Sequence, residues 1–466
     1  MPMNVGFAGD QYLTDIDLTG ESRQAEFYWN QRAASFGSRI VRVNVTWSNV
    51  APRTYPAGFN PTDPGSPYYY WRDVDSAVRA IAAAGEQPDL MVYLAPNWAQ
   101  GPGRPNTSLV REGTWMPDPT QFGNFAKAIA TRYSGYYQGL PRVIYYQAWN
   151  EENLGYYLNP VWTSSTASGQ PASPNVYRPM LDAFYNAVKS VSPANVVLMG
   201  GTAPYGDPPT KFWLGGPQRM PPLTFYRTLF CMNPKAPCAG PPPEFDVVDH
   251  HPYEVPPPQF HAIHAGDVAV PDVWQITRLV KAAVNAGDAL PRAPKQVWAG
   301  ELSWDSNPPS SNFIAAPIAD QACYYELSQF ELWHEGADTV LFEQVRDLPP
   351  APPWQATFRW GGILFYGGQP KPTATAFQFP FVAVHASRGR VELWGRAPRS
   401  GLLVISARTS FGAFVTVARL RINAGQVFDR FIRYRGPIAF QAQVGRSLSL
   451  TWTRPKPACP SIHFGT

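Results

Sequence analysis

Short apolar runs alternate with amphipathic stretches over the first 380 residues of the chain. Eight of the apolar runs are bounded by turn-forming residues, as expected for buried strands. They span residues 5–8, 40–46, 90–94, 143–148, 196–199, 247–250, 296–299 and 339–342. Helical periodicity marks residues 72–84, 121–133, 177–191, 273–286 and 318–335. The alternation predicts βα units and a parallel sheet.

Eight such repeats favour an α/β fold of the (β/α)8 TIM-barrel type, occupying residues 1–380. Barrel strands are buried on both faces and therefore read as continuous apolar runs, as these eight do. An open doubly wound sheet is the alternative fold. No GxGxxG motif follows the first strand, which weakens the dinucleotide-binding version of that alternative.

The segments that follow the predicted strands are long and rich in Pro, Gly and aromatic residues. They span residues 96–117, 153–174, 203–222, 252–271 and 344–360. In a TIM barrel the loops at the carboxyl ends of the strands build the functional face. The chain therefore has its insertions where a substrate cleft would lie.

The pattern changes after about residue 380, where period-two alternation and Gly turns replace the helical pattern. We expect residues 381–455 to form a small antiparallel, β-sandwich-like accessory module, followed by an irregular tail at 456–466. The expected role of the module is structural or substrate-flanking. A carbohydrate-binding module is the alternative.

Charge and hydropathy bear on the partners of the protein. The formal net charge is +4, with the basic residues scattered along the chain, and 14% of the residues are aromatic. No basic run and no nucleic-acid-binding motif is present, so a nucleic-acid partner is not expected. No apolar stretch reaches the roughly 18 residues of a membrane span. Aromatic side chains suit stacking on sugar rings, and equally suit core packing.

Four cysteines bear on the compartment in which the protein works. Cys231 and Cys238 lie in a Pro-rich segment and can close a small disulfide ring, with two reduced thiols as the alternative. Their spacing matches no zinc site. The chain opens with MPMNVGFAGD, without an apolar signal region, so we expect a secreted protein whose leader is removed, or a cytosolic one.

The segment VIYYQAWNEENLG carries the first candidate for catalysis. A strand ends at Trp149 and brings Asn150, Glu151 and Glu152 to the rim of the predicted barrel. Hydrolysis of a glycosidic bond requires an acid for the departing oxygen and a second carboxylate on the opposite face of the sugar ring. Glu151 is the predicted acid, and an Asn-Glu pair that caps a helix is the alternative.

The segment QVWAGELSWDS carries the second candidate, because Glu301 ends the predicted seventh strand. Strands four and seven of an eight-stranded ring face each other across its opening, so Glu301 and Glu151 can converge. Retaining enzymes hold two carboxyl groups about 5–5.5 Å apart, one as nucleophile and one as acid/base. A structural ion pair at the rim is the alternative for Glu301.

Three more polar groups fall on other strands. His251 and Tyr253 follow the sixth strand, where they can orient a nucleophile by hydrogen bonding. His250 and His251 are alternatively a buried structural pair. Arg42, on the second strand, brings a permanent cation that keeps a carboxylate ionised. A buried salt bridge is compatible with that role.

These segments resemble the retaining glycosidases of glycoside hydrolase clan A. WNEEN resembles the clan's Asn-Glu motif, WAGELSW its nucleophile segment, HHPY its sixth-strand segment and VRVNVTW its second-strand Arg segment. GGILFYGGQPKPTATAF is similar to the end of the barrel in families 5 and 39, and a barrel with a β module resembles family 39 more. The resemblance spans about residues 3–380. It implies Glu151 as acid/base, Asn150 as ligand of the sugar 2-hydroxyl, Glu301 as nucleophile and Tyr253 as its hydrogen-bond partner.

The chain departs from the clan's pattern at two places. Glu152 stands where the clan usually has Pro, and it competes with Glu151 as the acid. The eighth strand lacks the Trp that these families place under the sugar. Trp304, Trp360 and Phe342 are the candidates to replace it. Trp47, Trp98 and Trp149 are further candidates for stacking on a sugar.

The sequence therefore predicts a retaining glycosidase that acts on a glycoside, an oligosaccharide or a polysaccharide by double displacement, without a cofactor or a metal. The alternatives are a carbohydrate-binding barrel without turnover and a transglycosylase on the same scaffold. A metal-dependent hydrolase is weakened by the lack of an HxH motif on the first strand. Neither the sugar nor the oligomeric state follows from the sequence.

Overall fold

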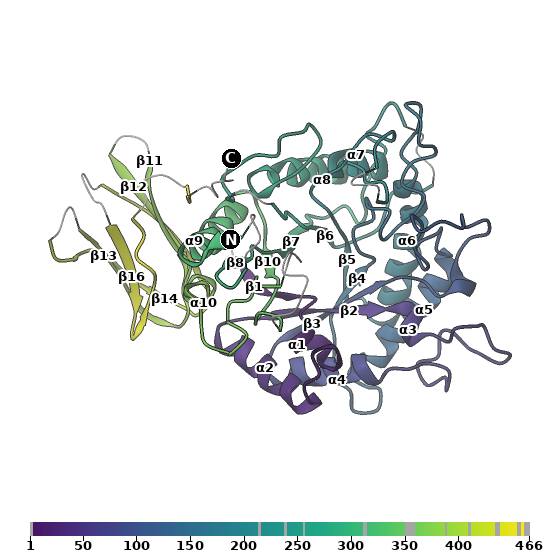
Figure 1. Cartoon of the computed structure of the whole chain (residues 1–466), viewed down its shortest axis with the longest axis horizontal. Coiled ribbons are helices and arrows are strands. Elements are labelled where there is room, and N and C mark those ends of the chain that lie inside the picture. The colour runs from purple at the N-terminus through teal and green to yellow at the C-terminus, as the bar shows by residue number, and fades with distance from the viewer. Residues whose placement is uncertain are drawn as a thin grey trace.

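The structure, a computed structural model, was obtained for the whole chain. It describes residues 3–212, 216–236, 240–254, 257–310, 315–349, 359–386, 389–408, 412–433, 439–453 and 458–460. Figure 1 shows a barrel with its surrounding helices, and the antiparallel strands of the C-terminal module to one side of it, next to α9 (Ile318–His334) and α10 (Pro372–Gln378).

Eight parallel strands close into the barrel, in the order β1-β10-β7-β6-β5-β4-β3-β2. They are β1 (Asn4–Ala8), β2 (Ile40–Thr46), β3 (Gln87–Tyr93), β4 (Tyr145–Ala148), β5 (Val196–Thr202), β6 (Val247–His250), β7 (Gln296–Leu302) and β10 (Thr339–Phe342). Each contains most or all of one predicted apolar run. The predicted TIM barrel is therefore confirmed, and the open sheet is excluded.

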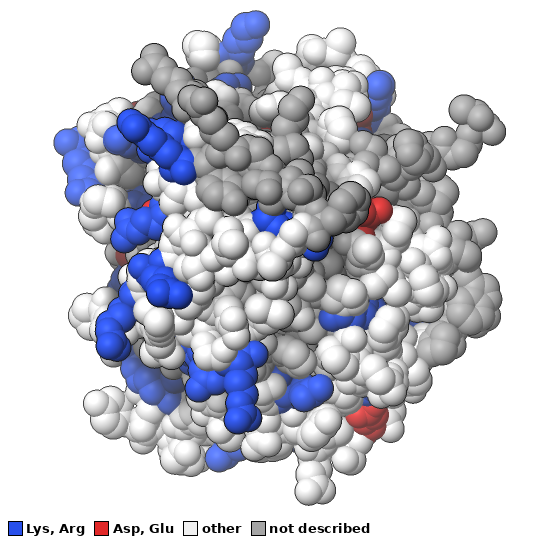
Figure 2. Space-filling model, turned by 90° about the vertical axis from the view of Figure 1, so that its left-hand side faces the viewer, with Lys and Arg blue, Asp and Glu red and all other residues white. Residues whose placement is uncertain are grey.

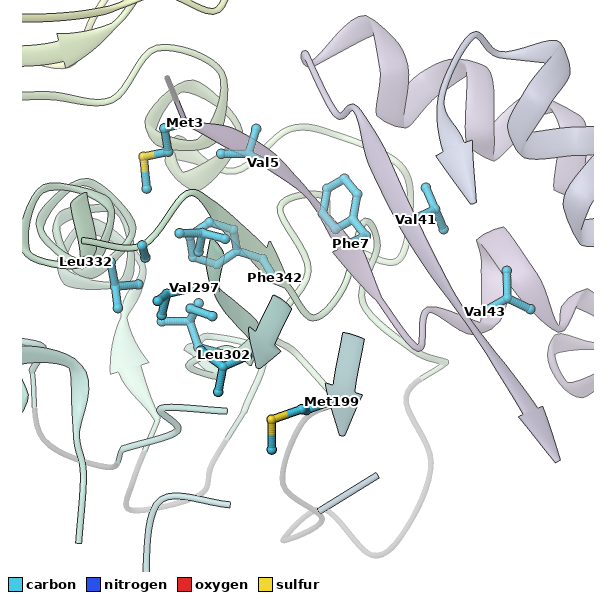
Figure 3. Packing of buried hydrophobic residues seen from close by; sticks show 14 of the residues in the cluster. Met3, Val5, Phe7, Val41, Val43, Met199, Val297, Leu302, Leu332 and Phe342 are labelled. Carbon is cyan, nitrogen blue, oxygen red and sulfur yellow. The ribbon is translucent and has the colours of Figure 1, made fainter. Parts of the chain in front are cut away.

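Alternation within the strands separates two apolar layers. On β2, Val41, Val43 and Val45 are buried in the main core cluster, which fills the space between the barrel and its helices (Figure 3). A second cluster is formed by six side chains from six of the barrel strands: Ala8, Ile40, Leu198, Val247, Trp298 and Leu341. Side chains on a strand alternate between its faces, so Arg42 lies on the opposite face of β2 from Val41 and Val43.

Helices surround the barrel. Besides α9 and α10 they are α1 (Gln11–Thr14), α2 (Arg23–Ser35), α3 (Trp47–Val50), α4 (Arg72–Ala83), α5 (Pro119–Arg132), α6 (Ser173–Val191), α7 (Pro222–Leu229) and α8 (Trp274–Ala286). The five predicted helices match α4, α5, α6, α8 and α9. Asp118 caps α5 by accepting a hydrogen bond from the backbone N–H of Gln121, and Gly287 ends α8 in the left-handed conformation.

The loops after β3, β4 and β5 support one another. Trp115 forms a bridge with Asn159, and Leu154 forms one with Arg219. The Asn153 side chain donates to the carbonyls of Ala203 and Met220. Backbone pairing between loops leaves fewer conformations open to each of them, so the rim beside β4 is a fixed surface on which a side chain can be positioned.

The C-terminal module consists of two antiparallel sheets. One has the order β11-β12-β15 and the other the order β14-β13-β16-β17. Their strands are β11 (Phe381–Ala386), β12 (Arg390–Arg396), β13 (Gly401–Arg408), β14 (Val415–Ile422), β15 (Val427–Arg433), β16 (Ala439–Val444) and β17 (Ser447–Leu448). Trp394 packs against Phe330 and Trp333 of α9, which attaches the module to the barrel.

A disulfide that the sequence analysis did not predict joins Cys323 of α9 to Cys459 near the C-terminus, with a sequence separation of 136 residues. Cys238, one member of the predicted Cys231–Cys238 ring, lies outside the described residues, as does most of the predicted tail. Within the part of the chain that the structure describes, no helix is both long and apolar enough to cross a membrane.

Candidate active site

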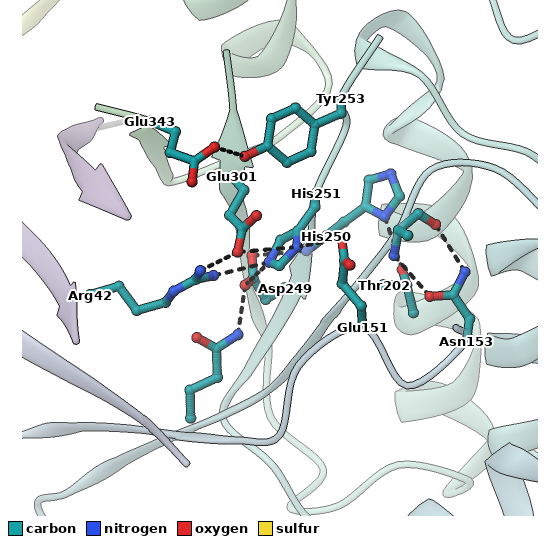
Figure 4. Close-up of polar contacts among 12 residues, drawn as sticks. Arg42, Glu151, Asn153, Thr202, Asp249, His250, His251, Tyr253, Glu301 and Glu343 are labelled. Atoms are coloured by element: carbon teal, nitrogen blue, oxygen red, sulfur yellow. Dashed lines mark hydrogen bonds and ion pairs between the residues drawn. The ribbon is translucent and has the colours of Figure 1, made fainter. Parts of the chain in front are cut away.

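Glu151 and Glu301 meet at the carboxyl ends of the barrel strands (Figure 4). Glu151 lies three residues after the end of β4, and Glu301 is the second-last residue of β7. One oxygen of each carboxyl group and Nδ1 of His251 lie within 4.8 Å of one another. Their side chains are 12% and 14% exposed, so both reach solvent from a largely buried position. The two glutamates therefore lie close together, as the sequence predicted.

The backbone around Glu151 turns this side chain toward the barrel opening. Trp149 has a φ of 81° and Glu151 a φ of 41°, both in the left-handed region that non-glycine residues rarely adopt. Such residues cost about 1–3 kcal/mol each. Two backbone hydrogen bonds hold the segment, from Trp149 N to Val92 O and from Glu151 N to Gly201 O.

Two cationic groups surround Glu301. The buried guanidinium of Arg42 donates to its carboxylate through Nη2. Nδ1 of His251 lies 3.6 Å from the same carboxylate and 3.1 Å from Oε1 of Glu151. Arg42 Nη1 also lies 3.2 Å from Nε2 of His251. The arrangement favours a negative charge on Glu301.

The two glutamates differ in pKa because their neighbours differ. Burial raises the pKa of Glu151, and the hydrogen bond from His251 compensates only in part. Burial also acts to raise the pKa of Glu301, but Arg42 and His251 outweigh it and lower that pKa below its usual value. Glu151 therefore retains its proton to a higher pH than Glu301. Carboxyl groups whose environments separate their pKa values in this way can serve as acid and nucleophile.

Asp249 of β6, which is itself hydrogen-bonded by Gln147 of β4, fixes His251. Nε2 of His251 lies 3.3 Å from Asp249 Oδ2, and Gln147 donates to the same Asp249 oxygen at 2.8 Å. Burial acts to lower the pKa of His251, but Glu301, Asp249 and Glu151 together raise it to about 10. The imidazole is thus a cation at neutral pH, with carboxylates at both nitrogens.

Tyr253 contacts a third carboxyl group. Its hydroxyl donates to Oε2 of Glu343 at 2.7 Å, and its proximity to Glu301 also helps to lower the pKa of Glu301. Glu343 follows β10 directly. Burial and the nearby Glu301 charge raise the pKa of Glu343 to about 8. Sequence reasoning missed Glu343, although its place at the end of the eighth barrel strand is the same signal that identified Glu301.

Three polar residues beside the two glutamates can now be placed. The buried Asn150 has an Oδ1 atom without a hydrogen-bond partner, which leaves it free for a ligand. Glu152 is fully buried on the other side of the chain, beside Tyr177, so it does not compete with Glu151. His250 contacts Thr202 and the carbonyl of Val268, and burial lowers its pKa to about 3. His250 is therefore a neutral structural residue.

The expectation that certain tryptophans stack on a sugar needs correction. Trp47 is 0% exposed, Trp360 is 1% exposed and Trp304 is 3% exposed. Trp47 packs against Phe125 and the other aromatic rings of the core, and Trp304 packs against Tyr324. None of the three offers a ring face to a ligand. Trp149 and Phe342 are also buried at 0% exposure.

Aromatic rings at the site come from other positions. Tyr93, the last residue of β3, and Tyr157, in the loop after β4, lie with their rings 6.2 Å apart, and both are only partly buried. Burial and then the charges of Glu151 and Glu301 raise the pKa of Tyr157, which places it near both glutamates. Trp98, also partly buried, donates through its indole N–H to Pro52 O at 2.8 Å and keeps part of its surface open.

Glycine at position 201 is required by the close approach of His251. A Cβ atom there would lie 2.0 Å from Nε2 of His251. We expect Gly201→Ala to shift His251 and to lower kcat/KM about a hundredfold, because a displacement of about 1 Å at reacting groups costs that much. Steady-state kinetics measure the effect.

A matched control for this prediction is Gly412→Ala, since an added Cβ at position 412 meets no atom within 4 Å. Its activity should equal that of the unchanged protein. Equal kinetics for Gly201→Ala and Gly412→Ala would contradict the role given to the backbone beside His251.

The buried carboxyl groups predict a pH dependence of stability. Burial raises the pKa of Asp89, Glu152 and Glu343 to about 8, and the carboxylates around His251 raise its pKa to about 10. Between pH 6.5 and 8 the folded chain thus retains protons that the unfolded chain has lost, so the free energy of unfolding falls as the pH rises. His250, whose pKa burial lowers to about 3, opposes this trend only close to pH 6.5, where an unfolded imidazole still binds part of a proton.

We expect the melting temperature to fall by several degrees from pH 6.5 to pH 8, as measured by differential scanning calorimetry. Each unit of pKa difference corresponds to about 1.4 kcal/mol. In Glu152→Gln the slope should be shallower, because one of the groups that retain a proton is removed. A melting temperature that is constant or rises over this interval would refute the assignment.

Glu151, His251 and Glu301 are also the only group of three among the described residues whose atoms are spaced as ligands of a metal ion. Two features of the site oppose a cation there. Arg42 already places a positive charge on Glu301, and a pKa of about 10 keeps a proton on His251. A metal ligand must be deprotonated, so the electrostatics favour proton transfer over metal binding.

Taken together, the fold and the site define a TIM barrel with a pair of carboxyl groups of opposite pKa shift at its carboxyl-terminal rim. Comparison with known proteins adds to this description. No family model matches the chain, and no curated protein matches it. Solved structures do match.

The chain is similar to a family 39 glycoside hydrolase from Bacteroides cellulosilyticus WH2, with a TM-score of 0.57 and 16% identity over 93% of this chain and 81% of the other. It is also similar to a monomeric beta-xylosidase from Caulobacter crescentus CB15, with a TM-score of 0.52 and 14% identity over 93% and 94% of the two chains. A glucosidase from Croceicoccus marinus gives a TM-score of 0.50 at 14% identity over 93% and 80%.

At these identities the likeness establishes the fold, which extends over the module as well as the barrel because 93% of the chain is covered. The resemblance to clan A glycosidases that the sequence motifs indicated is confirmed at the level of the fold. The roles of individual residues rest on the geometry of the site.

Proposed function

We propose that the protein is a retaining glycoside hydrolase with Glu301 as nucleophile and Glu151 as acid/base. The observation that carries the proposal is the meeting of these two carboxyl groups within 4.8 Å, with opposite pKa shifts. Retaining enzymes need about 5–5.5 Å, whereas inverting enzymes leave room for a water molecule at about 6.5–9.5 Å. The short separation therefore favours retention.

In the first step, the ionised Glu301 attacks the anomeric carbon while Glu151 transfers its proton to the glycosidic oxygen. The bond between that carbon and the oxygen breaks, and the sugar is left as an ester of Glu301. In the second step, Glu151, now a carboxylate, removes a proton from water. The water oxygen attacks the anomeric carbon, Glu301 leaves, and the product has the configuration of the substrate.

The surrounding residues prepare these steps. Arg42 holds Glu301 ionised, and His251, supported by Asp249, bridges the two glutamates. Asn150, next to Glu151 in the sequence, has a buried carbonyl oxygen without a partner, which can accept a hydrogen bond from the 2-hydroxyl of the sugar. The neutral carboxyl group of Glu343 adds a hydrogen-bond donor at neutral pH, because its pKa is about 8.

We also propose that the protein works in an oxidising compartment. The Cys323–Cys459 disulfide supports this, since structural disulfides persist in extracellular and periplasmic proteins and are rare in a reducing cytosol. A carbohydrate outside the cell fits the substrate class. Reduction of the purified protein should lower its melting temperature.

The proposal is tested with a panel of nitrophenyl glycosides and polysaccharides, with the first product anomer identified by proton NMR. We expect turnover of at least one substrate with net retention. First formation of the opposite anomer would exclude the double displacement. Binding without release of product would instead indicate a carbohydrate-binding barrel, and products longer than the substrate would indicate a transglycosylase.

A further inference from the structure

The charge of the chain is concentrated at one end. Residues 381–455 contain 12 arginines and two acidic residues, while the rest of the chain contains 26 basic and 32 acidic residues. The expectation that basic residues are scattered therefore needs correction: the module is strongly cationic and the barrel is anionic. Figure 2, which views the module end of the molecule, shows many basic side chains and few acidic ones on this face.

The two acidic residues of the module do not neutralise its arginines. Glu392 accepts from His334 of α9 at 2.9 Å. Asp429 interacts with Glu392, and its partial burial raises the pKa of Asp429. Within the module's described residues, no arginine forms an ion pair with a carboxylate, although such pairs occur throughout the barrel. Surfaces of ordinary proteins intersperse both signs of charge, so this excess calls for an anionic partner.

The sheet with the order β14-β13-β16-β17 turns one face to solvent. Its other face is buried through Leu403, Ile405 and Ala407 of β13 and the facing side chains of β16. On the open face, Arg421 pairs with Leu402, which is 50% exposed. Arg419 pairs in the same way with Val404. Two exposed arginines thus lie next to the exposed Leu402 and the partly buried Val404 on one face of the sheet.

Amide side chains continue this face across β16. Gln443 lies opposite Val404, and Gln441 lies opposite Ser406. A row therefore runs from Arg419 through Val404 to Gln443, from guanidinium to aliphatic group to amide. Guanidinium groups bind carboxylate and sulfate in bidentate fashion, amides bind hydroxyl groups, and aliphatic side chains cover the apolar faces of sugar rings.

We propose that this open face of the module, the arginine face formed by Arg419, Arg421, Leu402, Val404 and Gln443, binds an acidic polysaccharide. The glycan part of the proposal rests on the proposed function, and the anionic part rests on the charge of the module. The five residues of the arginine face lie on β-strands and include no aromatic side chain, whereas proteins engage the grooves of nucleic acids mostly with helices and stack unpaired bases on aromatic rings. Carboxylated and sulfated polysaccharides share the required chemistry.

The test measures binding by isothermal titration calorimetry in the Glu301→Gln background, so that no polymer is degraded. The probes are polygalacturonate, a sulfated galactan, neutral xylan and duplex DNA. We expect one of the two acidic polysaccharides to bind at least about tenfold more tightly than xylan, and the affinity to fall as salt is added.

Arg419→Gln combined with Arg421→Gln should weaken that binding about tenfold, since two charge contacts that can be bidentate are lost. The matched control, Arg79→Gln with Lys281→Gln, removes two exposed charges from α4 and α8 and should leave the affinity unchanged. Calorimetric melting curves check that both variants are folded.

Three results would overturn the inference: no binding of either acidic polysaccharide, equal effects of the two double variants, or tighter binding of DNA than of both polysaccharides. The last would identify the face as a nucleic-acid surface. Failure of the proposed function has a separate signature, because a chain that hydrolyses no glycoside can still bind the acidic polymer through this face.

Discussion

The Glu301→Gln variant is expected to lose at least about ten-thousand-fold in kcat, because the amide cannot attack the anomeric carbon. The fold should persist, since the glutamine can still accept the hydrogen bond that Arg42 donates to position 301. Steady-state kinetics on the best substrate of the panel give kcat, and circular dichroism checks the fold. A folded variant that keeps more than a tenth of the activity would remove Glu301 from the mechanism.

The loss in this variant should not depend on the leaving group. Glu301 acts in the formation of the bond to the sugar, so poor and activated leaving groups suffer alike. His251 adds a second readout. With a neutral residue at position 301, the largest of the charges that raise the pKa of His251 is gone, so NMR should show a lower pKa for its imidazole.

The Glu151→Ala variant is expected to show a loss that does depend on the leaving group. A glycoside with a poor leaving group should lose about 100- to 10,000-fold in kcat, the usual contribution of general acid catalysis. A dinitrophenyl glycoside should form the ester of Glu301 almost as fast as before, because its leaving group needs no proton. Azide should then enter the space vacated at position 151 and restore turnover.

The product of that rescue should be a glycosyl azide with the configuration of the substrate, which NMR identifies. Glu152→Gln is the matched control, since its carboxyl group is the next in the sequence and is buried away from Glu301. It should retain full activity. Loss of activity in Glu152→Gln together with an active Glu151→Ala would reverse the assignment of the acid.

The sequence predicted those parts of the molecule that a pattern of consecutive residues identifies. β2, β6 and β10 match the predicted runs residue for residue, because strands buried on both faces carry a continuous apolar pattern. Glu151 and Glu301 could be found for a related reason. A carboxyl group directly after an apolar strand lies at the barrel rim, and the closed ring brings strands four and seven together.

Other features depend on contacts that no local pattern reports. Trp47 and Trp304 are aromatic residues near strand ends, yet both are buried among aromatic rings, and the sequence does not say which way a side chain points. The contact between Tyr253 and Glu343 spans 90 residues of sequence, and the Cys323–Cys459 disulfide spans 136. Such partners are set by the three-dimensional fold.

The choice between Glu151 and Glu152 shows the same limit at adjacent positions. Both carboxyl groups follow β4, and burial raises the pKa of each. The left-handed φ of Glu151 directs its carboxyl group to His251, whereas Glu152 packs so close to Gly200 that a Cβ there would lie 2.2 Å from its Oε1. A backbone conformation of this kind is fixed by the surrounding loops.

The identity of the nucleophile can be measured directly by trapping the ester intermediate. A 2-deoxy-2-fluoro glycoside with an activated leaving group reacts in the first step and stalls before the second, because fluorine at carbon 2 destabilises the oxocarbenium-like transition states. Mass spectrometry of the intact protein and of its peptides then locates the sugar. We predict a single label on the side chain of Glu301. A label on Glu151 or Glu343, or an unlabelled protein that still hydrolyses the parent glycoside, would contradict it.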